Sequence, residues 1–180
     1  MDSVQSGSRT FLTIANLSNL TELNNLRQRN IDFHKPWVYH GNTDTYLEKI
    51  ASGRTISLLL WTSPSTSLIG VINLNEPVMG ALQSAYLGYF IDERFAGQGY
   101  MSEGLRLALD HAFSKLGFHR LEANIQPGNT SSIALVKRLG FRLEGFSPKY
   151  LKINDHWCDH ERWAILADER VRVKTIESYV

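Results

Sequence analysis

The sequence predicts a single mixed α/β domain, and three observations support this prediction. The chain has 180 residues, which is enough for one domain with a substantial core. Hydrophobic residues make up 43% and charged residues 21%, which excludes a disordered, collagen-like or coiled-coil chain. Short apolar runs alternate with segments of helical periodicity, in the expected order β-α-α-β-β-β-α-β-α-β-β. We expect the core to span about residues 8–168, with tails at 1–7 and 169–180.

The first half of the chain predicts a strand, two helices and three further strands. Leu20, Leu23 and Leu26 recur at helical spacing, and Ser18 or Asn19 before them is a suitable N-cap. The apolar run TISLLLW is too short for most helices, so it predicts a buried strand, and the turn TSPSTS after it predicts a hairpin. The expected ranges are strand 8–14, helices 18–29 and 43–51, and strands 55–61, 67–74 and 83–91.

The second half predicts a long amphipathic helix, a strand, a short helix and a final hairpin. An apolar stripe that includes Met101, Leu105 and Ala108 predicts a helix over residues 100–116, and Gly117 is its expected stop. Asn129 is the expected cap of the short helix. The expected ranges are strand 119–126, turn Pro127-Gly128, helix 130–139 up to Gly140, and hairpin 141–166 with its turn near Asn154-Asp155.

Charge and cysteine content exclude several classes of protein. The 19 basic and 18 acidic residues give a formal net charge of +1, which offers no support for a nucleic-acid or membrane-surface partner. No apolar stretch approaches the roughly 18 residues of a membrane helix, and the polar start lacks the apolar run of a signal peptide. The single cysteine, Cys158, excludes an internal disulfide. We therefore expect a soluble, cytoplasmic protein.

The segment from Ile91 to Glu103 (IDERFAGQGYMSE) reads as strand, glycine loop and helix start. Glycines let backbone N–H groups approach a ligand closely, and the first turn of a helix leaves N–H groups without partners, so this arrangement suits phosphate or pyrophosphate. A tight turn that binds nothing is the alternative. A dinucleotide fingerprint would need a third glycine where Ser102 stands, and a P-loop would need Gly-Lys-Ser/Thr, which is absent. A coenzyme A pyrophosphate site needs only the amides.

Three segments, YLGYFIDERFAGQGYMSEGLRLALDHAF, HRLEANIQPGNTSSIALVKRLGFRLEG and YLKINDHWCDH, resemble the GNAT acetyltransferase superfamily. Within it they are most similar to the RimJ/RimL-like branch of ribosomal-protein-alanine N-acetyltransferases. The resemblance covers about residues 8 to 168 and is most specific from Tyr86 to Asp159. It implies a GNAT fold, with a twisted, mostly antiparallel sheet of about seven strands, splayed in the middle, and about four helices. It also implies acetyl-CoA as co-substrate and no metal.

The resemblance implies a set of cofactor-binding residues. The family's loop pattern, Gln/Arg-x-x-Gly-x-Gly/Ala, fits either Arg94-x-x-Gly97-x-Gly99 or Ala96-x-x-Gly99-x-Met101, and the spacing from Asp92 favours the second. The departures from the pattern matter little if main-chain N–H groups hold the pyrophosphate. A main-chain N–H near Ile91 would hold the thioester carbonyl, where negative charge develops during attack. The implied residues are Tyr89, Phe90, Ile91, Ala96, Gly97, Gln98, Gly99, Tyr100, Met101, Ser102 and Asn129.

Ser132 and Glu122 are the implied catalytic residues. Many family members place a tyrosine, the usual general acid, where this chain has Val136, and Ser132 matches a serine that is proposed to protonate the leaving thiolate. An ordinary first-turn helix serine is the alternative. Glu122 is the only carboxylate on the polar face of its strand, so it is a candidate base, directly or through water. The closest register places Asn124 at the family's glutamate position, and solvent exposure of this face is the alternative.

The acceptor side of the site is the least determined by the sequence. Phe33, His34, Trp37 and Tyr39 cluster after the first helix, where the family walls its acceptor site, and a small satellite core is the alternative. We take Phe33, Trp37 and Asn124 as substrate-binding residues. Although His156, Cys158 and His160 alternate along one segment, we expect no metal site, because surface histidines on strands seldom ligate metals.

The implied acceptor is a protein N-terminal α-amine. Reaching the neutral amine at pH 7 costs about 1.4 kcal/mol for an α-amine and roughly 4.6 for a lysine, so a weak base suits the α-amine. The alternatives are a small amine such as a polyamine, amino acid or antibiotic, and a non-catalytic acyl-CoA-binding module. We expect a monomer or homodimer, with no nucleic-acid or membrane partner.

Overall fold

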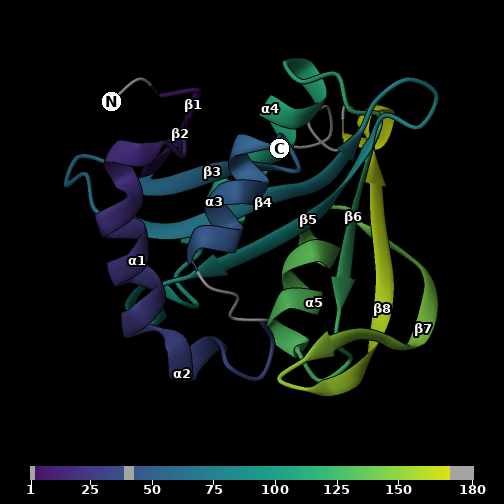
Figure 1. Cartoon of the computed structure of the whole chain (residues 1–180). Helices are drawn as coiled ribbons and strands as arrows, with labels where there is room; N and C mark the ends of the chain where they lie inside the picture. The colour runs from purple at the N-terminus through teal and green to yellow at the C-terminus, as the bar shows by residue number, and fades with distance from the viewer. Residues whose placement is uncertain (1–2, 39–42, 171–180) are drawn as a thin grey trace.

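The computed structural model describes residues 3–38 and 43–170, and these form one eight-stranded sheet with helices on both faces (Figure 1). The strands are β1 (Gln5–Ser6), β2 (Thr10–Ile14), β3 (Thr55–Thr62), β4 (Leu68–Val78), β5 (Ser84–Ile91), β6 (Arg120–Ile125), β7 (Arg142–Ile153) and β8 (His156–Leu166). The helices are η1 (Leu17–Asn19), α1 (Leu20–Arg29), α2 (Ile31–His34), α3 (Thr43–Ala51), η2 (Glu93–Phe95), α4 (Tyr100–Ser114) and α5 (Thr130–Arg138).

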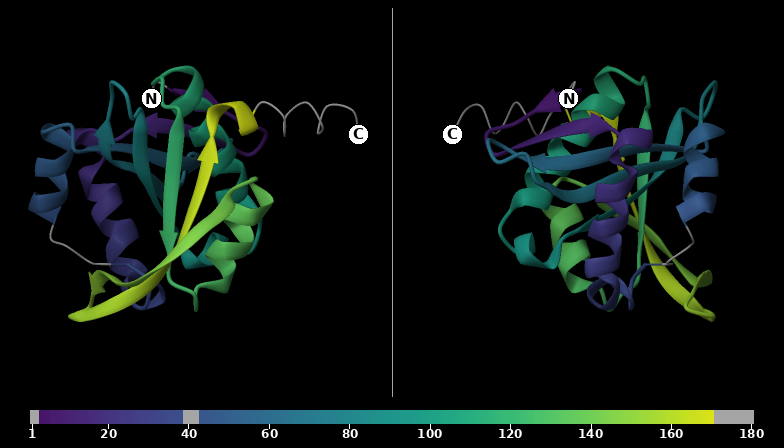
Figure 2. Two further views of the ribbon diagram at one scale, coloured as in Figure 1. Left: turned by 90° about the vertical axis from the view of Figure 1, so that its right-hand side faces the viewer. Right: turned by 60° about the vertical axis from the view of Figure 1, so that its left-hand side comes forward.

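The two faces of the sheet bury separate cores. Leu58 and Leu60 of β3 pack in the core with α4 and α5, whereas Leu59 and Trp61 pack on the opposite face with α1 and α3. Figure 2 shows these helix pairs on opposite sides of the sheet. A strand that is covered on both faces needs apolar residues at every position, which explains the unbroken run in β3. Within the described residues no helix is long and apolar enough to cross a membrane.

The sheet splays between β5 and β6. Its order is β1-β2-β3-β4-β5-β6-β8-β7, and neighbouring strands are antiparallel except β5 and β6, which are parallel. The β5–β6 register ends at Tyr86 and Glu122, although β5 stays paired with β4 as far as Ile91 and β6 stays paired with β8 as far as Ile125. The C-terminal ends of β5 and β6 therefore diverge (Figure 1). The predicted GNAT fold, with a mostly antiparallel, splayed sheet, is confirmed.

Most predicted elements agree with the structure within two residues, but β4 continues to Val78, four residues beyond the predicted end at 74, and further differences lie near the N-terminus. Gln5 and Ser6, assigned to the tail, pair with β2 and bring the sheet to eight strands. A two-residue strand has no alternation of its own to reveal it.

Asn19, one of the two predicted caps, is the N-cap of α1, but its side chain makes no capping hydrogen bond. The chain enters through a 3₁₀ turn in which the Asn16 side chain accepts a hydrogen bond from the Ser18 N–H at 2.9 Å. Asn154 and Asp155 form the predicted β7–β8 turn with positive φ.

Candidate active site

The glycine loop leaves a run of unpaired amides at the start of α4. Gly97 and Gly99 have φ of 72° and 83°, in the left-handed region that favours glycine. Gly99 is the N-cap of α4 and offers no side-chain cap. The first helical hydrogen bond runs from the Glu103 N–H to the Gly99 carbonyl at 3.1 Å. Within the described residues the N–H groups of residues 97–102 have no hydrogen-bond acceptor, so they form a cradle for an anion.

The side chains around this loop favour main-chain recognition. Met101 and Ser102 are buried, so they offer a ligand only their amides. Arg9 places its guanidinium 4.6 Å from the centre of the Tyr100 ring and donates a hydrogen bond of 3.2 Å to the Gln98 carbonyl. The Arg9 Nε also pairs with Glu103 at 3.2 Å. A positively charged side chain therefore lies beside the unpaired amides, which suits a phosphate-bearing ligand.

The end of β5 exposes backbone groups toward the splay. Ile91 faces Gly70 in the β4–β5 register, and the Asp92 N–H donates to the Ile69 carbonyl at 2.7 Å. This pattern makes Ile91 and Gly70 a non-hydrogen-bonded pair, so the Ile91 N–H and carbonyl point away from β4. The carbonyl accepts a hydrogen bond from His34 Nε2 at 2.7 Å. The Ile91 N–H remains directed toward the space where β6 diverges, as the predicted thioester contact requires.

Asp92 ties the end of β5 to the first helix and to the loop. Its carboxylate is 1% exposed and lies 2.7 Å from both Arg29 Nε and Arg94 Nη2. Burial alone would raise the Asp92 pKa, but the hydrogen bonds from Arg94 and Arg29 outweigh it and hold the pKa far below its usual range. Asn30 adds a further link, because its side-chain oxygen accepts from the Glu93 N–H at 2.8 Å. These contacts fix the end of β5 and the start of the glycine loop against α1.

Tyr89 packs on the face of β5 that is directed toward α4 and α5, and Ser132 stands in the first turn of α5. Burial raises the pKa of the Tyr89 phenol to about 12, and the nearby Ser132 side chain lowers it in part. The two hydroxyls do not meet the geometry of a formed hydrogen bond, so the Tyr89 hydroxyl is buried without a partner in the described chain. Ser132 is held by Asn129, whose side-chain oxygen accepts from the Ser132 N–H at 3.2 Å. Asn129 thus caps α5, and its predicted contact with the cofactor stays a prediction.

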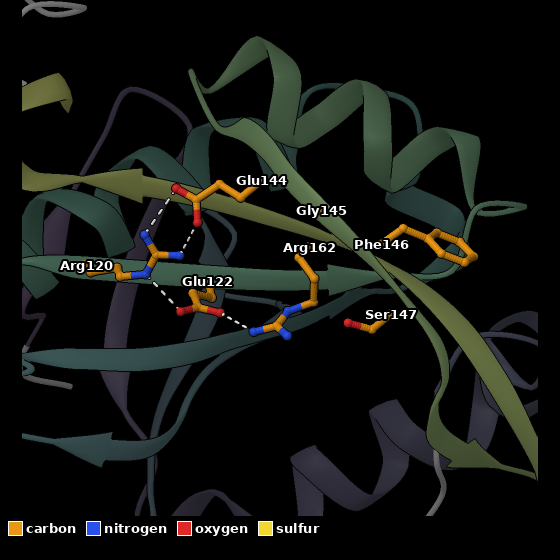
Figure 3. A pocket seen from close by; sticks show the side chains of 7 residues that line it. All are labelled: Arg120, Glu122, Glu144, Gly145, Phe146, Ser147 and Arg162. Carbon is orange, nitrogen blue, oxygen red and sulfur yellow. Dashed lines mark hydrogen bonds and ion pairs between the residues drawn. The ribbon is translucent and has the colours of Figure 1, made fainter.

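Glu122 lies on the opposite face of β6, in a pocket of paired charges (Figure 3). Its two oxygens accept from Arg120 Nε at 2.8 Å and from Arg162 Nη2 at 2.7 Å. Glu144 likewise pairs with Arg120, and with Arg142 at 2.7 Å. The remaining lining residues are Gly145, Phe146 and Ser147.

The ion pairs determine what Glu122 can do. Burial alone would raise the Glu122 pKa, but the hydrogen bonds from Arg120 and Arg162 outweigh burial, and the pKa lies below the ordinary carboxyl value. Glu122 is therefore ionised at neutral pH, with a low affinity for a proton. The role of Glu122 as a base stays a prediction. Its ion pairs favour a weak base that receives the proton through a water molecule.

The predicted acceptor residues lie around the same face. Asn124 is the register partner of Arg162, and its side-chain oxygen is buried without a partner in the described chain. Phe33 is 39% exposed and Trp37 38% exposed, so neither belongs to a satellite core. Trp37 lies against the turn after β6, where a Cβ on Gly128 would be 3.5 Å from its ring. Tyr39 lies outside the described residues.

The structure brings the predicted cofactor residues to adjoining places at the ends of β5 and α4. Sequence reasoning named His34 only as part of the acceptor cluster and missed its contact with the Ile91 carbonyl. It also missed the contacts of Glu103 with Arg9 and Thr10 and of Arg162 with Glu122. The one sequence feature that could have indicated the Asp92 ion pairs is the position of this carboxylate directly after a buried strand. Among the described residues no three His, Cys, Asp or Glu side chains gather closely enough to hold a metal ion.

A splayed sheet with an uncapped helix N-terminus beside the splay defines the class of acyl-CoA-dependent N-acetyltransferases. Residues 11–142 match the acetyltransferase (GNAT) domain, and the chain belongs to this family.

Relatives and solved structures agree with this assignment. A probable N-acetyltransferase, YjcK of Bacillus subtilis (strain 168), is 39% identical over 121 residues, 67% of each chain. The ribosomal protein uS5-alanine N-acetyltransferase of Escherichia coli (strain K12) is 38% identical over 101 residues, 56% of this chain and 52% of the relative. The matched segment thus spans about half to two thirds of these relatives.

Two of the similar structures were solved with CoA. RimJ of Mycobacterium smegmatis in complex with CoA-disulfide aligns with a TM-score of 0.77 and 26% identity, over 92% of this chain and 89% of that chain. Spermidine N-acetyltransferase from Vibrio cholerae, in complex with CoA and spermine, aligns with a TM-score of 0.78 and 22% identity, over 92% and 99%.

The residues of this chain fit coenzyme A. The amides of residues 97–102 and the Arg9 guanidinium would hold its pyrophosphate, and the Ile91 N–H faces the place of the thioester carbonyl. The unpartnered Tyr89 hydroxyl lies on the same side of the sheet. When bound, the co-substrate supplies an activated acetyl group.

Proposed function

We propose that this chain acetylates protein N-terminal α-amines with acetyl-CoA. The observation that carries the proposal is the run of unpaired amides at residues 97–102, beside a splay into which the Ile91 N–H points. The amides bind the diphosphate and set the depth of the co-substrate. The Ile91 N–H then stabilises the negative charge that develops on the carbonyl oxygen as the amine attacks.

Two side chains complete the proposed chemistry from opposite faces of the sheet. Ser132, at the start of α5, protonates the sulfur that leaves. Glu122, on the far face of β6, receives the proton of the attacking amine through water. Because its pKa is lowered, Glu122 is a weak base, and a weak base suits an α-amine, whose neutral form is about 3 kcal/mol more accessible than that of lysine at pH 7. Phe33 and Trp37, both more than a third exposed, line the acceptor entrance.

The charge of the pocket favours a peptide over a polyamine. Both pocket carboxylates, Glu122 and Glu144, are neutralised by arginines, so the pocket offers a polycation no free acidic pair. A pocket whose carboxylates are already paired attracts a polycation less than a free acidic pair would, which favours a peptide acceptor with a single amine.

A matched panel of acceptors tests this function. The purified chain is incubated with acetyl-CoA and a peptide with a free N-terminal alanine, the same peptide with a blocked N-terminus and an internal lysine, or spermidine. Released thiol and the mass of the acceptor are measured. We expect the free peptide to gain one acetyl group and the blocked peptide to gain none. Turnover with spermidine alone would contradict the acceptor assignment, and tight binding without turnover would show a non-catalytic acyl-CoA-binding module.

A further inference from the structure

The edge of β5 that faces the splay carries backbone groups whose partner strand has diverged. The β5–β6 register ends at Tyr86 and Glu122, so the carbonyls on that edge beyond Tyr86 have no neighbouring strand. The last of them, the Ile91 carbonyl, accepts a hydrogen bond of 2.7 Å from His34 Nε2. A histidine of α2 thus takes the place of a strand partner, at the residue whose N–H the proposed function directs at the thioester carbonyl.

Burial and ring packing fix the orientation of His34. The residue is 6% exposed, and its ring lies beside the rings of Phe33 and Phe90, with centroid separations of 5.2 Å and 5.1 Å. Because a carbonyl oxygen only accepts hydrogen bonds, Nε2 carries a proton in its contact with Ile91. That nitrogen therefore cannot also take a proton from the attacking amine. The contact orients the backbone of Ile91 and is not the contact of a base.

The residues that follow His34 are held to the opposite wall of the splay. The Pro36 carbonyl accepts a hydrogen bond of 3.1 Å from Gln126 Nε2, one residue beyond the end of β6. The Lys35 carbonyl accepts a hydrogen bond from the Asn154 side chain in the β7–β8 turn. This segment therefore connects the end of β5 to the end of β6 across the splay, and it holds the end of β5 from the side opposite to β4.

We propose that His34 is a positioning residue whose hydrogen bond to the Ile91 carbonyl holds the Ile91 N–H in the direction of the thioester oxygen. This inference rests on the proposed function. The N–H and the carbonyl of a strand residue lie on the same edge of the strand, so a rotation that moves one of them moves the other. A backbone donor stabilises the negative charge best when its direction is fixed before the amine attacks. No proton passes through His34 in this role.

Two substitutions separate the hydrogen bond of His34 from the packing of its ring. Glutamine keeps an N–H donor at about the position of Nε2, whereas methionine has a similar length and no donor. His34→Gln is therefore compared with His34→Met. The stability control is Thr13→Val, which removes the buried hydrogen bond from Trp61 Nε1 to the Thr13 hydroxyl at 2.9 Å. These two residues lie in β2 and β3, away from the splay.

The first test follows the protein by NMR and does not depend on turnover. We expect the ¹³C signal of the Ile91 carbonyl to move upfield in His34→Met, because its hydrogen bond is lost, and to stay in place in Thr13→Val. In the unmodified chain and in His34→Gln, the Ile91 N–H signal should move further with acetyl-CoA than with CoA, which lacks the thioester carbonyl. This difference should be lost in His34→Met. The same difference in all variants would overturn the proposal.

The second test is steady-state turnover with the peptide acceptor. We expect His34→Met to lower kcat by about tenfold, since a misdirected donor loses part of the roughly 100-fold effect of removing one. The affinity for CoA, measured by calorimetry, should stay unchanged, because residues 97–102 hold the diphosphate. His34→Gln should restore most of kcat, although glutamine cannot act as a base. Thr13→Val should lower the melting temperature and leave kcat unchanged.

The outcomes separate this inference from the proposed function. Equal losses of kcat in His34→Gln and His34→Met would assign the effect to ring packing and refute the positioning role, as would an unchanged kcat in His34→Met. A weaker affinity for CoA in His34→Met would assign His34 to the co-substrate site and also refute it. Absence of turnover in the unmodified chain with every acceptor would refute the proposed function instead. The comparison of acetyl-CoA with CoA at the Ile91 N–H would then still decide whether His34 directs that group.

Discussion

The two sides of the splay differ in the groups that they offer to a ligand. On the donor side, backbone N–H groups of residues 97–102 are left unpaired by two left-handed glycines and an uncapped helix. On the acceptor side, side chains of β6, β7 and β8 neutralise one another in ion pairs, as at Glu122 and Arg162. A backbone cradle depends on chain geometry and tolerates many side chains, whereas an ion-paired pocket depends on each residue. In the proposed function, binding of the co-substrate thus depends on the main chain, and the choice of acceptor depends on side chains.

The largest effect is expected where a side chain must act on the donor side. Ser132→Ala should lower kcat by about 100-fold, since a positioned proton donor contributes roughly that factor, and should leave the KM for acetyl-CoA unchanged. Steady-state kinetics measure both constants. The matched control is Ser131→Ala, which removes the neighbouring hydroxyl that donates to Asn129 at 3.0 Å. Equal losses in both variants would mean that Ser132 acts only through the structure of α5.

The next effect concerns the contacts that hold the end of β5 and the glycine loop against α1. Asp92→Asn should reduce the free energy of unfolding by about 2 kcal/mol, because the buried carboxylate holds hydrogen bonds from Arg29 and Arg94. Since the Asp92 pKa is lowered in the folded protein, this stabilisation is present above the unfolded pKa near 4 and is lost as the pH falls further. Denaturant unfolding at pH 7 and pH 3 measures it. Asp155→Asn, at an exposed ion pair with Lys152, should leave stability unchanged at both values. An Asp92 variant as stable as the unmodified chain would contradict the network.

The pH dependence distinguishes the acceptor amine from Glu122. The lowered pKa keeps Glu122 ionised throughout the neutral range. The pH dependence of the rate should therefore follow the deprotonation of the acceptor amine. We expect kcat/KM for the peptide acceptor to rise about tenfold per pH unit and to level off near pH 8. Glu122→Gln should lower the rate without moving this limb. A rise of kcat/KM between pH 5 and 7 that disappears in Glu122→Gln would show that the Glu122 pKa is not lowered, and would contradict this prediction.

The smallest effect is expected for alanine substitution in the glycine loop, compared with the same substitution at a glycine outside the loop. Gly97 and Gly80 share a φ of 72°, and a Cβ on either would meet nothing within 4 Å. Alanine at either position should destabilise the fold similarly, by about 1 kcal/mol. Only Gly97→Ala should also weaken acetyl-CoA binding, about fivefold by calorimetry. Equal affinities in the two variants would place the diphosphate elsewhere.

Local patterns predicted most of the fold and the donor side, and long-range contacts account for what they missed. The apolar run of β3 and the stripe of α4 are readable because each residue's burial follows from its own period. The glycine loop is also predictable from local sequence, because a backbone with positive φ favours glycine. The Asp92 carboxylate meets Arg29 across 63 positions of sequence, and the Glu103 carboxylate accepts a hydrogen bond from the Arg9 N–H across 94 positions. No periodicity encodes such pairs.

The acceptor side shows this limit most clearly. The alternation in β6 places Glu122 and Asn124 on one face, as predicted, but whether that face held a free carboxylate depended on Arg120 and Arg162. Arg162 comes from β8, which reaches β6 only through the strand order of the finished sheet. A sequence can therefore give the direction of a side chain without giving its charge environment.

The most direct test of the central claim is an amide NMR titration of the labelled protein with coenzyme A. We predict that the backbone N–H signals of residues 97–102 shift downfield as they become hydrogen-bonded, together with that of Ile91, while those of the Glu122 pocket move little. Saturable binding that leaves the signals of residues 97–102 in place would contradict the account.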